Sequence, residues 1–382
     1  MVLGHAAPRR APSDRGIAEP VVIMVELRNG SKGYGETFPA DRTGPDGGAT
    51  MIAEVADTYL PPLSRFHPAS FPDALEAIEQ LPMRGPHGPG IPAARAAVEV
   101  AMLDAVMRFY GRTLDDVVAW MGLPGFGGPG ALDRLRFSGW LVQPDVVNTV
   151  RTVCRLYRTG VRDFKMRVGR PNDRERLERV TYVLRRGIAR GAVTLGVDAG
   201  GAWTKDEAIE WLDDAADLPI AYVEQPVPRD HEEDTLVLRD LFDTSLVLDA
   251  SVVTVPDAER LVALGLDGGF SIGLCKCGGL MPSLRLAAWT RRARVAVHFA
   301  GEVGETSVLA RAGLGFLGVC PGVRRAVGCL GSRVLAADIV RRGVRFGWGG
   351  RPPRFRSNGV TVAPDPELLE RLSACEPAVY KL

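Results

Sequence analysis

The chain lacks the features that mark several large protein classes. Its 382 residues carry 47 Lys and Arg against 46 Asp and Glu, so the formal net charge is only +1. Such a balance leaves no polyelectrolyte surface for nucleic acid or an acidic membrane. No apolar run approaches the ~18 residues of a membrane span. No nucleic-acid or membrane partner is therefore expected, and any site for an anion must be local.

Cysteine is also scarce, and the sequence holds no CxxC pair. No charged-then-apolar signal segment opens the chain, which predicts a reduced protein in the cytoplasm. Cys275 and Cys277 are expected to pack near the barrel mouth described below rather than to react or bind metal. The six cysteines are Cys154, Cys275, Cys277, Cys320, Cys329 and Cys375.

The sequence does contain a recognisable α+β unit at its front. Residues 21–36 read as strand, turn and strand, with Asn29-Gly30 as the turn signal. Two Gly/Pro-rich stretches, 43–50 and 82–92, are predicted to be loops, and residues 93–111 have apolar positions at helical spacing.

Beyond a Gly-rich linker at 124–133, short apolar strands alternate with amphipathic helices. Residues that mark the ends of six strands recur at intervals of 24 to 33, about one strand plus one crossover helix: Lys165, Asp198, Glu224, Asp249, Gly273 and His298. The length suits a βα barrel of roughly 250 residues with a smaller attached domain. In such a barrel the carboxyl ends of the strands face one mouth, where active sites lie.

Three of these strand ends are carboxylates, namely Asp198, Glu224 and Asp249. Three converging carboxylates repel one another unless a cation joins them, and oxygen ligands suit a hard divalent ion such as Mg²⁺. The alternative is that each acid caps the helix that follows it. The occurrence of all three on consecutive strands favours the metal.

The stretch "DFKMRVG" at 163–169 places two cations on the same side of a strand, because side chains alternate between its faces. Lys165 and Arg167 are therefore predicted to face the metal mouth, where negative charge would develop on a substrate. The alternative is a structural pair that neutralises the carboxylates.

These motifs resemble the enolase superfamily, in the branch of muconate cycloisomerases, dipeptide epimerases and mandelate racemases. The matching pieces are "GYGE", "AAVEVAMLDA", "FKMRVG", "VDAGGAW", "YVEQP", "LDAS", "LCKCGGL" and "GETSVLA". The resemblance implies an α/β fold, a modified TIM-type (β/α)7β barrel at 131–340 with an α+β capping domain. That domain would comprise residues 1–130 and a returning C-terminal segment, 341–382. The sequence shows no strand where such capping domains have their first one.

The resemblance also implies a cofactor and a chemistry. Mg²⁺, or alternatively Mn²⁺, would be held by Asp198, Glu224 and Asp249 and would bind a substrate carboxylate. A base would remove the α-proton, and the resulting enediolate would collapse by epimerisation, cycloisomerisation or elimination. The enzyme would then be an isomerase or a lyase, and a homo-oligomer is expected.

The sequence departs from the superfamily pattern at four positions. The second lysine of the usual Lys-x-Lys pair is Arg167, a poor proton acceptor and a good carboxylate clamp. Gly273 stands where the opposing lysine is usual, Gly200 where Asn is usual, and Ala250 where Glu is usual. Both expected acid/base lysines are therefore missing.

Other residues are candidates to replace them. Lys276 lies three residues beyond Gly273, although a loop lysine that meets only solvent is the alternative. His298 has a suitable unperturbed pKa near ~6.5, unless strand parity turns it toward the helices. Glu302 and Glu305 are expected to approach the substrate with Gly273, and Glu305 is alternatively structural.

Two further hypotheses remain open. In one, the metal and Arg167 serve a carboxylate rearrangement without α-proton abstraction. In the other, the chain binds a carboxylate without turnover.

Overall fold

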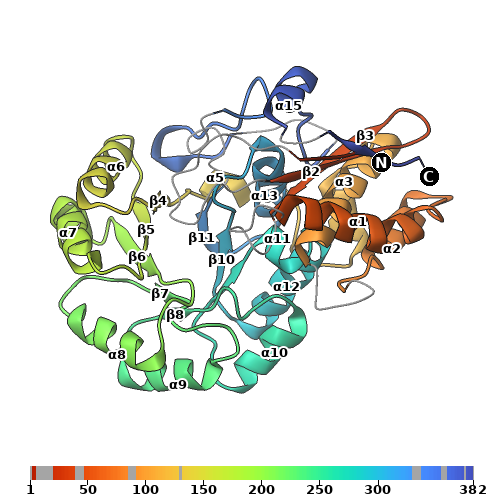
Figure 1. The fold of residues 1–382 in the computed structure, drawn as a ribbon. Coiled ribbons are helices and arrows are strands. Elements are labelled where there is room, and N and C mark those ends of the chain that lie inside the picture. The colour runs from red at the N-terminus through yellow and green to blue at the C-terminus, as the bar shows by residue number, and fades with distance from the viewer. Residues whose placement is uncertain are drawn as a thin grey trace.

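A parallel barrel with an antiparallel capping sheet at its side makes up the computed structural model of the chain (Figure 1). The structure describes residues 2–5, 20–38, 47–84, 92–128, 131–328, 337–353, 359–373 and 376–381. The predicted α/β architecture is confirmed.

The capping sheet contains strands from both ends of the chain, which lie together in Figure 1. Its order is β12-β1-β2-β3. The predicted hairpin is present as β2 (Val21–Glu26) and β3 (Lys32–Thr37). The prediction that the capping domain lacks its usual first strand was wrong. Strand β1 (Val2–His5) is present and pairs antiparallel with β2 and with β12 (Ala378–Val379). The last strand therefore lies in the sheet that the first strands build.

Helix α3 packs its backbone directly on β3. A Cβ atom on Gly33 would lie 2.1 Å from the Ala101 carbonyl oxygen, and one on Gly35 would lie 1.9 Å from that of Ala97. Only glycine permits this approach, which explains the "GYGE" stretch. The loop predicted at 43–50 ends early, because α1 begins at residue 47. The bounds are α1 Gly47–Leu63, α2 Phe71–Glu79, α3 Pro92–Tyr110 and α4 Leu114–Trp120.

The barrel consists of parallel strands β4 to β11, in two sheets of order β4-β5-β6-β7-β8 and β11-β10-β9. Parallel bridges between Leu248 and Phe270 and between Phe137 and Ala326 close the circle. The strands are β4 Gly139–Leu141, β5 Asp163–Arg167, β6 Thr194–Asp198, β7 Val223–Glu224, β8 Leu246–Val247, β9 Phe270–Ile272, β10 Val297–Ala300 and β11 Val323–Val327.

Helices follow each of the first seven barrel strands and form an arc around them in Figure 1. None of the helices within the described ranges is both long and apolar enough to cross a membrane. The bounds are α5 Ala131–Arg134, α6 Val146–Arg158, α7 Asp173–Ala189, α8 Lys205–Asp214, α9 Glu232–Leu241, α10 Val255–Ala263, α11 Leu274–Cys277, α12 Leu280–Ala293, α13 Ser307–Val319, the 3-10 turn η1 Trp348–Gly350 and α15 Pro366–Leu372.

Three buried acids of the capping domain accept backbone N–H groups from distant parts of the chain. Glu36 accepts from Thr306 and Leu309 at the start of α13. Glu99 accepts from the first two residues of α12, and Asp104 from two residues of the 359–373 segment. Free N–H groups at the starts of α12 and α13 need such acceptors, so Glu99 and Glu36 fix the capping domain to the barrel, whereas Asp104 fixes the C-terminal segment to α3.

Candidate active site

The acidic residues predicted as metal ligands lie at the carboxyl ends of three neighbouring strands. Asp198 ends β6, Glu224 ends β7, and Asp249 comes two residues after the end of β8. Asp198 pairs in register with Glu224, which pairs with Val247. Asp198 and Glu224 are buried, whereas Asp249 is partly exposed. Parallel pairing therefore brings all three to the same mouth of the barrel.

Strand β5 points three charged side chains into the barrel, one above another. Asp163 at its start contacts Ser138, whereas Lys165 and Arg167 contact the acidic ends of the neighbouring strands. The alternation of strand side chains places these three on one face. The predicted inward direction of Lys165 and Arg167 is what the structure shows.

Lys165 bridges two of the carboxylates. Its Nζ lies 2.8 Å from Glu224 Oε1 and 3.3 Å from Asp198 Oδ2. Burial alone would lower the pKa of Lys165, but the two carboxylates outweigh it and hold the pKa above its usual value. Burial, with the charges of Asp198 and Asp249, raises the pKa of Glu224 to about 7 despite Lys165. Lys165 is therefore a fixed cation.

Arg167 lies nearer the solvent and contacts the same cluster. Its Nη1 donates a hydrogen bond of 3.0 Å to Asp198 Oδ1. The guanidinium lies against Gly200, where a Cβ atom would be 2.1 Å from Nη1 and 2.4 Å from Cζ. The side chain can occupy this place only because residue 200 is glycine.

Lys276 is directed into the site rather than to solvent. Its Nζ donates to Asp249 Oδ1 at 2.7 Å and to the backbone oxygens of Asp249 and Ser271. Burial lowers the pKa of Lys276, but the Asp249 charge outweighs this effect and the net shift is upward. An ammonium group that donates to three acceptors is a poor base. In this arrangement Lys276 holds the Asp249 carboxylate in place.

Gln225 connects the ends of β7 and β8. Its Oε1 accepts hydrogen bonds from the backbone N–H groups of Asp249 and Ser251. Its Nε2 donates to Ser251 Oγ and to the Val227 carbonyl. These bonds hold Asp249 in place from the backbone side, while Lys276 holds its carboxylate.

The donor set is chemically suited to a hard divalent cation, because it supplies only carboxylate oxygens. As the side chains lie, however, each carboxylate is directed to a cation. No three acidic, histidine or cysteine side chains in the described part of the chain gather closely enough to hold a metal ion. Metal binding at Asp198, Glu224 and Asp249 would therefore replace some of these ion pairs.

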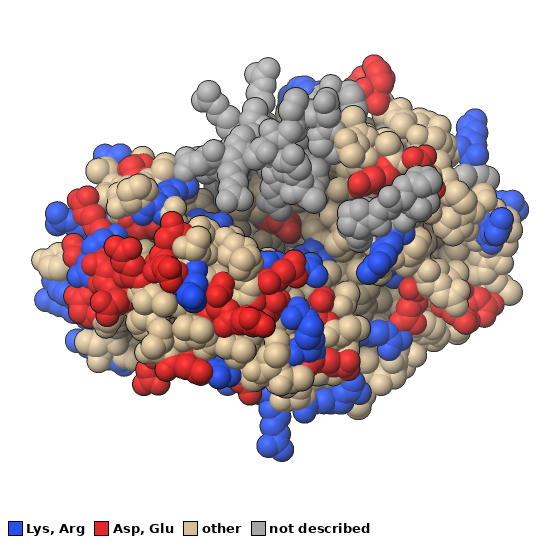
Figure 2. Space-filling model, turned by 60° about the horizontal axis from the view of Figure 1, so that its bottom comes forward, with Lys and Arg blue, Asp and Glu red and all other residues tan. Residues whose placement is uncertain are grey.

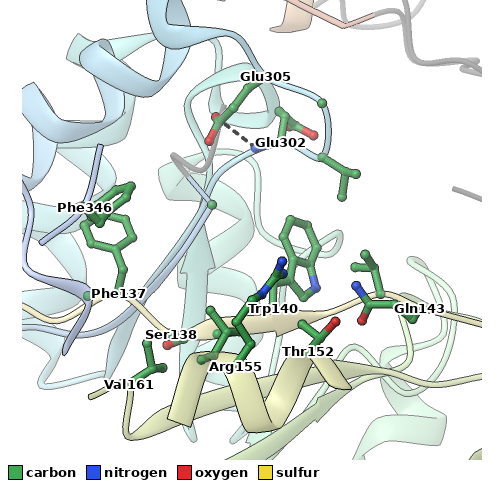
Figure 3. Close-up of a pocket in the computed structure, with 17 residues that line it drawn as sticks. Phe137, Ser138, Trp140, Gln143, Thr152, Arg155, Val161, Glu302, Glu305 and Phe346 are labelled. Atoms are coloured by element: carbon green, nitrogen blue, oxygen red, sulfur yellow. Dashed lines mark hydrogen bonds between the residues drawn. The ribbon is translucent and has the colours of Figure 1, made fainter. Parts of the chain in front are cut away.

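A pocket of about 250 Å³ opens on the same side of the barrel, between β4, α6 and the loop after β10 (Figure 3). Trp140 and Gln143 reach into it from below, and Glu302 and Glu305 lie opposite. The backbone N–H of Glu302 donates to Glu305 Oε2. The Trp140 ring also lies 5.4 Å from Lys165 Nζ. Trp140 therefore joins the pocket to the carboxylate cluster.

Two polar atoms of this pocket have no hydrogen-bond acceptor or donor within the described residues. They are the buried Nε1 of Trp140 and Oε1 of Gln143. A buried polar atom without a partner costs free energy, so a bound molecule that reached these two atoms would gain by pairing with them.

His298 points into the barrel, as its candidacy required, but lies below this mouth. Its ring meets Tyr222 edge-on at 5.0 Å, and its Nε2 lies 3.4 Å from Arg325 Nη1. Burial, together with the Arg325 charge, lowers the pKa of His298 to about 3. The imidazole is neutral at neutral pH and is enclosed by Tyr222 and Arg325. His298 therefore packs inside the barrel and does not face the mouth.

The comparisons with known proteins agree with this geometry. A family model described as Enolase C-terminal domain-like matches residues 148–365. The chain belongs to the enolase superfamily. It is an enzyme, and the similar proteins described in the next paragraph are isomerases of this superfamily.

The L-Ala-D/L-amino acid epimerase of Pedosphaera parvula is 29% identical over 78% of this chain and 79% of its own length. The N-succinyl-L-Arg/Lys racemase of Bacillus cereus is 24% identical over 77% of this chain and 74% of its own. The solved muconate cycloisomerase of Pseudomonas fluorescens is 18% identical, with a TM-score of 0.81 over 98% of both chains.

Two departures from the superfamily pattern are explained by one contact. The guanidinium of Arg167 fills the space that a side chain at residue 200 would need, so Arg167 and Gly200 fit each other. Gly273 is also confined, since a Cβ there would lie 3.0 Å from the Ala300 carbonyl oxygen and 3.9 Å from Lys276 Cβ. Nothing in the structure explains Ala250.

Sequence reasoning missed Trp140, Gln143 and Gln225. Trp140 pairs in register with Lys165, so strand parity could have placed it in the mouth once β4 was aligned with β5. Gln225 gave a weaker signal, because its role depends on a backbone φ of 42° that the sequence does not reveal.

Proposed function

We propose that this chain is a Mg²⁺-dependent isomerase or lyase that removes the α-proton of a small carboxylate substrate. The resulting enediolate would be resolved by epimerisation, cycloisomerisation or elimination. The observation that carries the proposal is the buried cluster of Lys165, Asp198 and Glu224 at the barrel mouth, next to a pocket of about 250 Å³.

Asp198, Glu224 and Asp249 would hold the Mg²⁺, or alternatively Mn²⁺. When bound, a divalent ion acts as a Lewis acid toward the substrate carboxylate. Charge balance supports this role. The three carboxylates are matched by three cations, Lys165, Arg167 and Lys276, so their formal charges cancel. The two positive charges of the metal are then matched by the two negative charges of an enediolate.

Arg167 would clamp the substrate carboxylate, because a guanidinium presents paired donors and stays protonated. Lys165 would stabilise the negative charge that develops beside it. Lys276 would position Asp249. In this assignment none of the three removes the α-proton.

The pocket would hold the remainder of the substrate. Trp140 Nε1 offers a donor and Gln143 Oε1 an acceptor, which together match an amide group. Related enzymes are named for N-succinylated amino acids and for dipeptides, both of which carry an amide next to a carboxylate. We therefore propose an N-acyl amino acid or dipeptide as the substrate class, with Gly273, Glu302 and Glu305 near it.

One observation favours a second function. Arg167, Lys276 and Lys165 are all held as cations, and His298 is enclosed. Glu302 and Glu305 are then the remaining candidates for a base. If neither serves, the metal and Arg167 would support a rearrangement without α-proton abstraction, or the chain would bind carboxylates without turnover.

Solvent-deuterium exchange separates these functions. The protein is stripped of metal, reloaded with Mg²⁺ or Mn²⁺, and incubated in D₂O with N-acyl amino acids, dipeptides and muconate, with exchange followed by NMR. Metal-dependent exchange at the α-carbon supports the first function. Turnover without exchange supports the rearrangement, and metal-dependent binding alone supports a binding protein.

Asp249→Asn should abolish exchange and weaken Mg²⁺ binding in calorimetry. The matched control is Asp57→Asn, because Asp57 is an exposed acid on α1 of the capping domain. Equal loss in both variants would contradict the metal assignment.

The proposal includes a homo-oligomer in the cytoplasm, with domain boundaries near residues 130 and 340. The four described cysteines are free thiols, and Cys329 and Cys375 lie outside the described residues. Sedimentation velocity, cell fractionation and limited proteolysis test these three points.

A further inference from the structure

A second cavity lies at the opposite end of the barrel. It measures about 1090 Å³ and is lined by the first residues of three strands, Asp163 of β5, Thr194 of β6 and Val323 of β11. All barrel strands are parallel, so this end is separated from the mouth by the length of the strands. The cavity is therefore distinct from the active site.

The walls of this cavity carry an excess of positive charge. Asp163 is the one acidic residue among the described residues that line it. It is matched by Arg325, whose Nε lies 3.5 Å from Asp163 Oδ1. The remaining lining arginines form no ion pair with any described residue, and they are Arg136, Arg162, Arg324 and Arg351.

This excess is local, since the whole chain has a formal net charge of only +1. Acidic side chains gather instead over α8 and α9 on the outer surface, as Figure 2 shows. Those of α8 are Asp206, Glu207, Glu210, Asp213 and Asp214. The positive charge at the cavity is thus a local excess, and an anion would be drawn to it.

An aromatic ring stands at the edge of the cavity. Trp348 in η1 is 68% exposed, although it is among the largest side chains of the protein. Its indole lies against the backbone of Gly160, where a Cβ atom would be 2.5 Å from Nε1. Glycine at residue 160 lets the ring approach the wall closely, while most of its surface stays free to stack on a planar group.

We propose that this cavity binds a nucleoside diphosphate or triphosphate. Guanidinium groups bind phosphate oxygens through paired donors and remain charged at all physiological pH values. The volume exceeds what an inorganic phosphate needs and is in the range of cofactor sites. The phosphates would contact Arg324 and Arg351, and the base would stack on Trp348.

Calorimetry at low salt, with EDTA present, tests the proposal. We expect ADP to bind at one site, pyrophosphate more weakly, inorganic phosphate more weakly still, and adenosine without detectable heat. Arg324→Ala and Arg351→Ala should each weaken ADP and pyrophosphate by roughly tenfold or more. Trp348→Ala should weaken ADP by roughly fivefold or more and leave pyrophosphate unchanged.

Arg28→Ala is the matched control, because Arg28 is an exposed arginine of the capping hairpin. Arg167→Met tests whether ADP enters the active site instead, and it should leave ADP binding unchanged. All variants are on the surface or at the mouth, and circular dichroism confirms that they fold.

Several results would overturn the proposal. These are no binding of ADP or pyrophosphate, binding that survives both cavity arginine variants, or binding lost in Arg167→Met. A fall in sedimenting mass in Arg324→Ala without any anion binding would show that copies of the chain cover this end. The readout is binding at the far end of the barrel, so it succeeds or fails independently of the proposed α-proton chemistry.

Discussion

The contact between Arg167 and Gly200 makes a sharp prediction about two positions that depart from the superfamily pattern. Gly200→Asn should displace the guanidinium, because a Cβ atom at residue 200 would lie 2.1 to 2.4 Å from it. In an Arg167→Lys background the same change should be tolerated, since an ammonium group leaves the space beside residue 200 free. The double variant restores the usual Lys-x-Lys and Asp-x-Asn patterns.

The magnitude follows from what each change removes. Gly200 has a φ of +57°, but asparagine tolerates the left-handed region, so the backbone cost should stay below about 1 kcal/mol. Displacing Arg167 breaks a charged hydrogen bond to Asp198, which typically contributes about 1.5–3 kcal/mol. The Arg167 side chain is 28% exposed and Asp198 keeps Lys165, so about 1–2 kcal/mol is expected.

Urea unfolding of the wild type, the two single variants and the double variant measures this coupling. We expect the double variant to be about 1–2 kcal/mol more stable than the sum of the single changes predicts. Additivity within about 0.5 kcal/mol would refute the steric account.

The affinity for a carboxylate substrate should show the same coupling between residues 167 and 200. Arg167→Met should weaken carboxylate binding more than Arg167→Lys, because it removes the charge.

Three shorter predictions concern other parts of the molecule. Burial raises the pKa of Glu36 from 4.5 to about 7. The protonated Glu36 side chain therefore stabilises the fold fully below pH 4.5, and this stabilisation is lost as the pH rises from 4.5 through 7. Glu36→Gln should make the fall in Tm between pH 4.5 and 7 less steep, and an unchanged slope would contradict this reasoning. Lys276→Met should lower the unfolding free energy by about 2 kcal/mol, because it leaves Asp249 without its cation, whereas Lys276→Arg should retain part of that free energy. Equal stability of the two variants would show that the Lys276–Asp249 ion pair does not stabilise the fold. Trp140→Phe should raise KM for an amide-bearing substrate while kcat changes less, and an unchanged KM would remove Trp140 from the pocket's role.

The sequence was sufficient for the features that repeat along it. The regular spacing of strand-end residues predicted the barrel, and strand parity predicted that Lys165 and Arg167 face inward. Local composition was a poorer guide where distant contacts decide the structure. Strand β1 is short and is stabilised by pairing with β12 at the other end of the chain. Helix α1 begins at residue 47 inside a Gly-rich stretch that by itself favours a loop.

The site was predictable in its residue types but not in its contacts. That carboxylates lie at the ends of β6, β7 and β8 follows from the pattern. The match between Arg167 and Gly200, the clamp by Gln225 and the enclosure of His298 depend on which side chains meet across the barrel. Such pairs are separated by many residues, and no local periodicity encodes them.

The three buried acids of the capping domain have a consequence for how the chain is made. Glu99, Glu36 and Asp104 receive their N–H donors from residues that follow them by 181, 270 and 256 positions. At typical rates of synthesis these partners leave the ribosome roughly ten to fifty seconds later. Until then α3, which is buried almost throughout in the finished protein, has no barrel to pack on. The nascent front of this enzyme can therefore pack α3 only on its own hairpin and on α1 and α2 until the barrel has been synthesised.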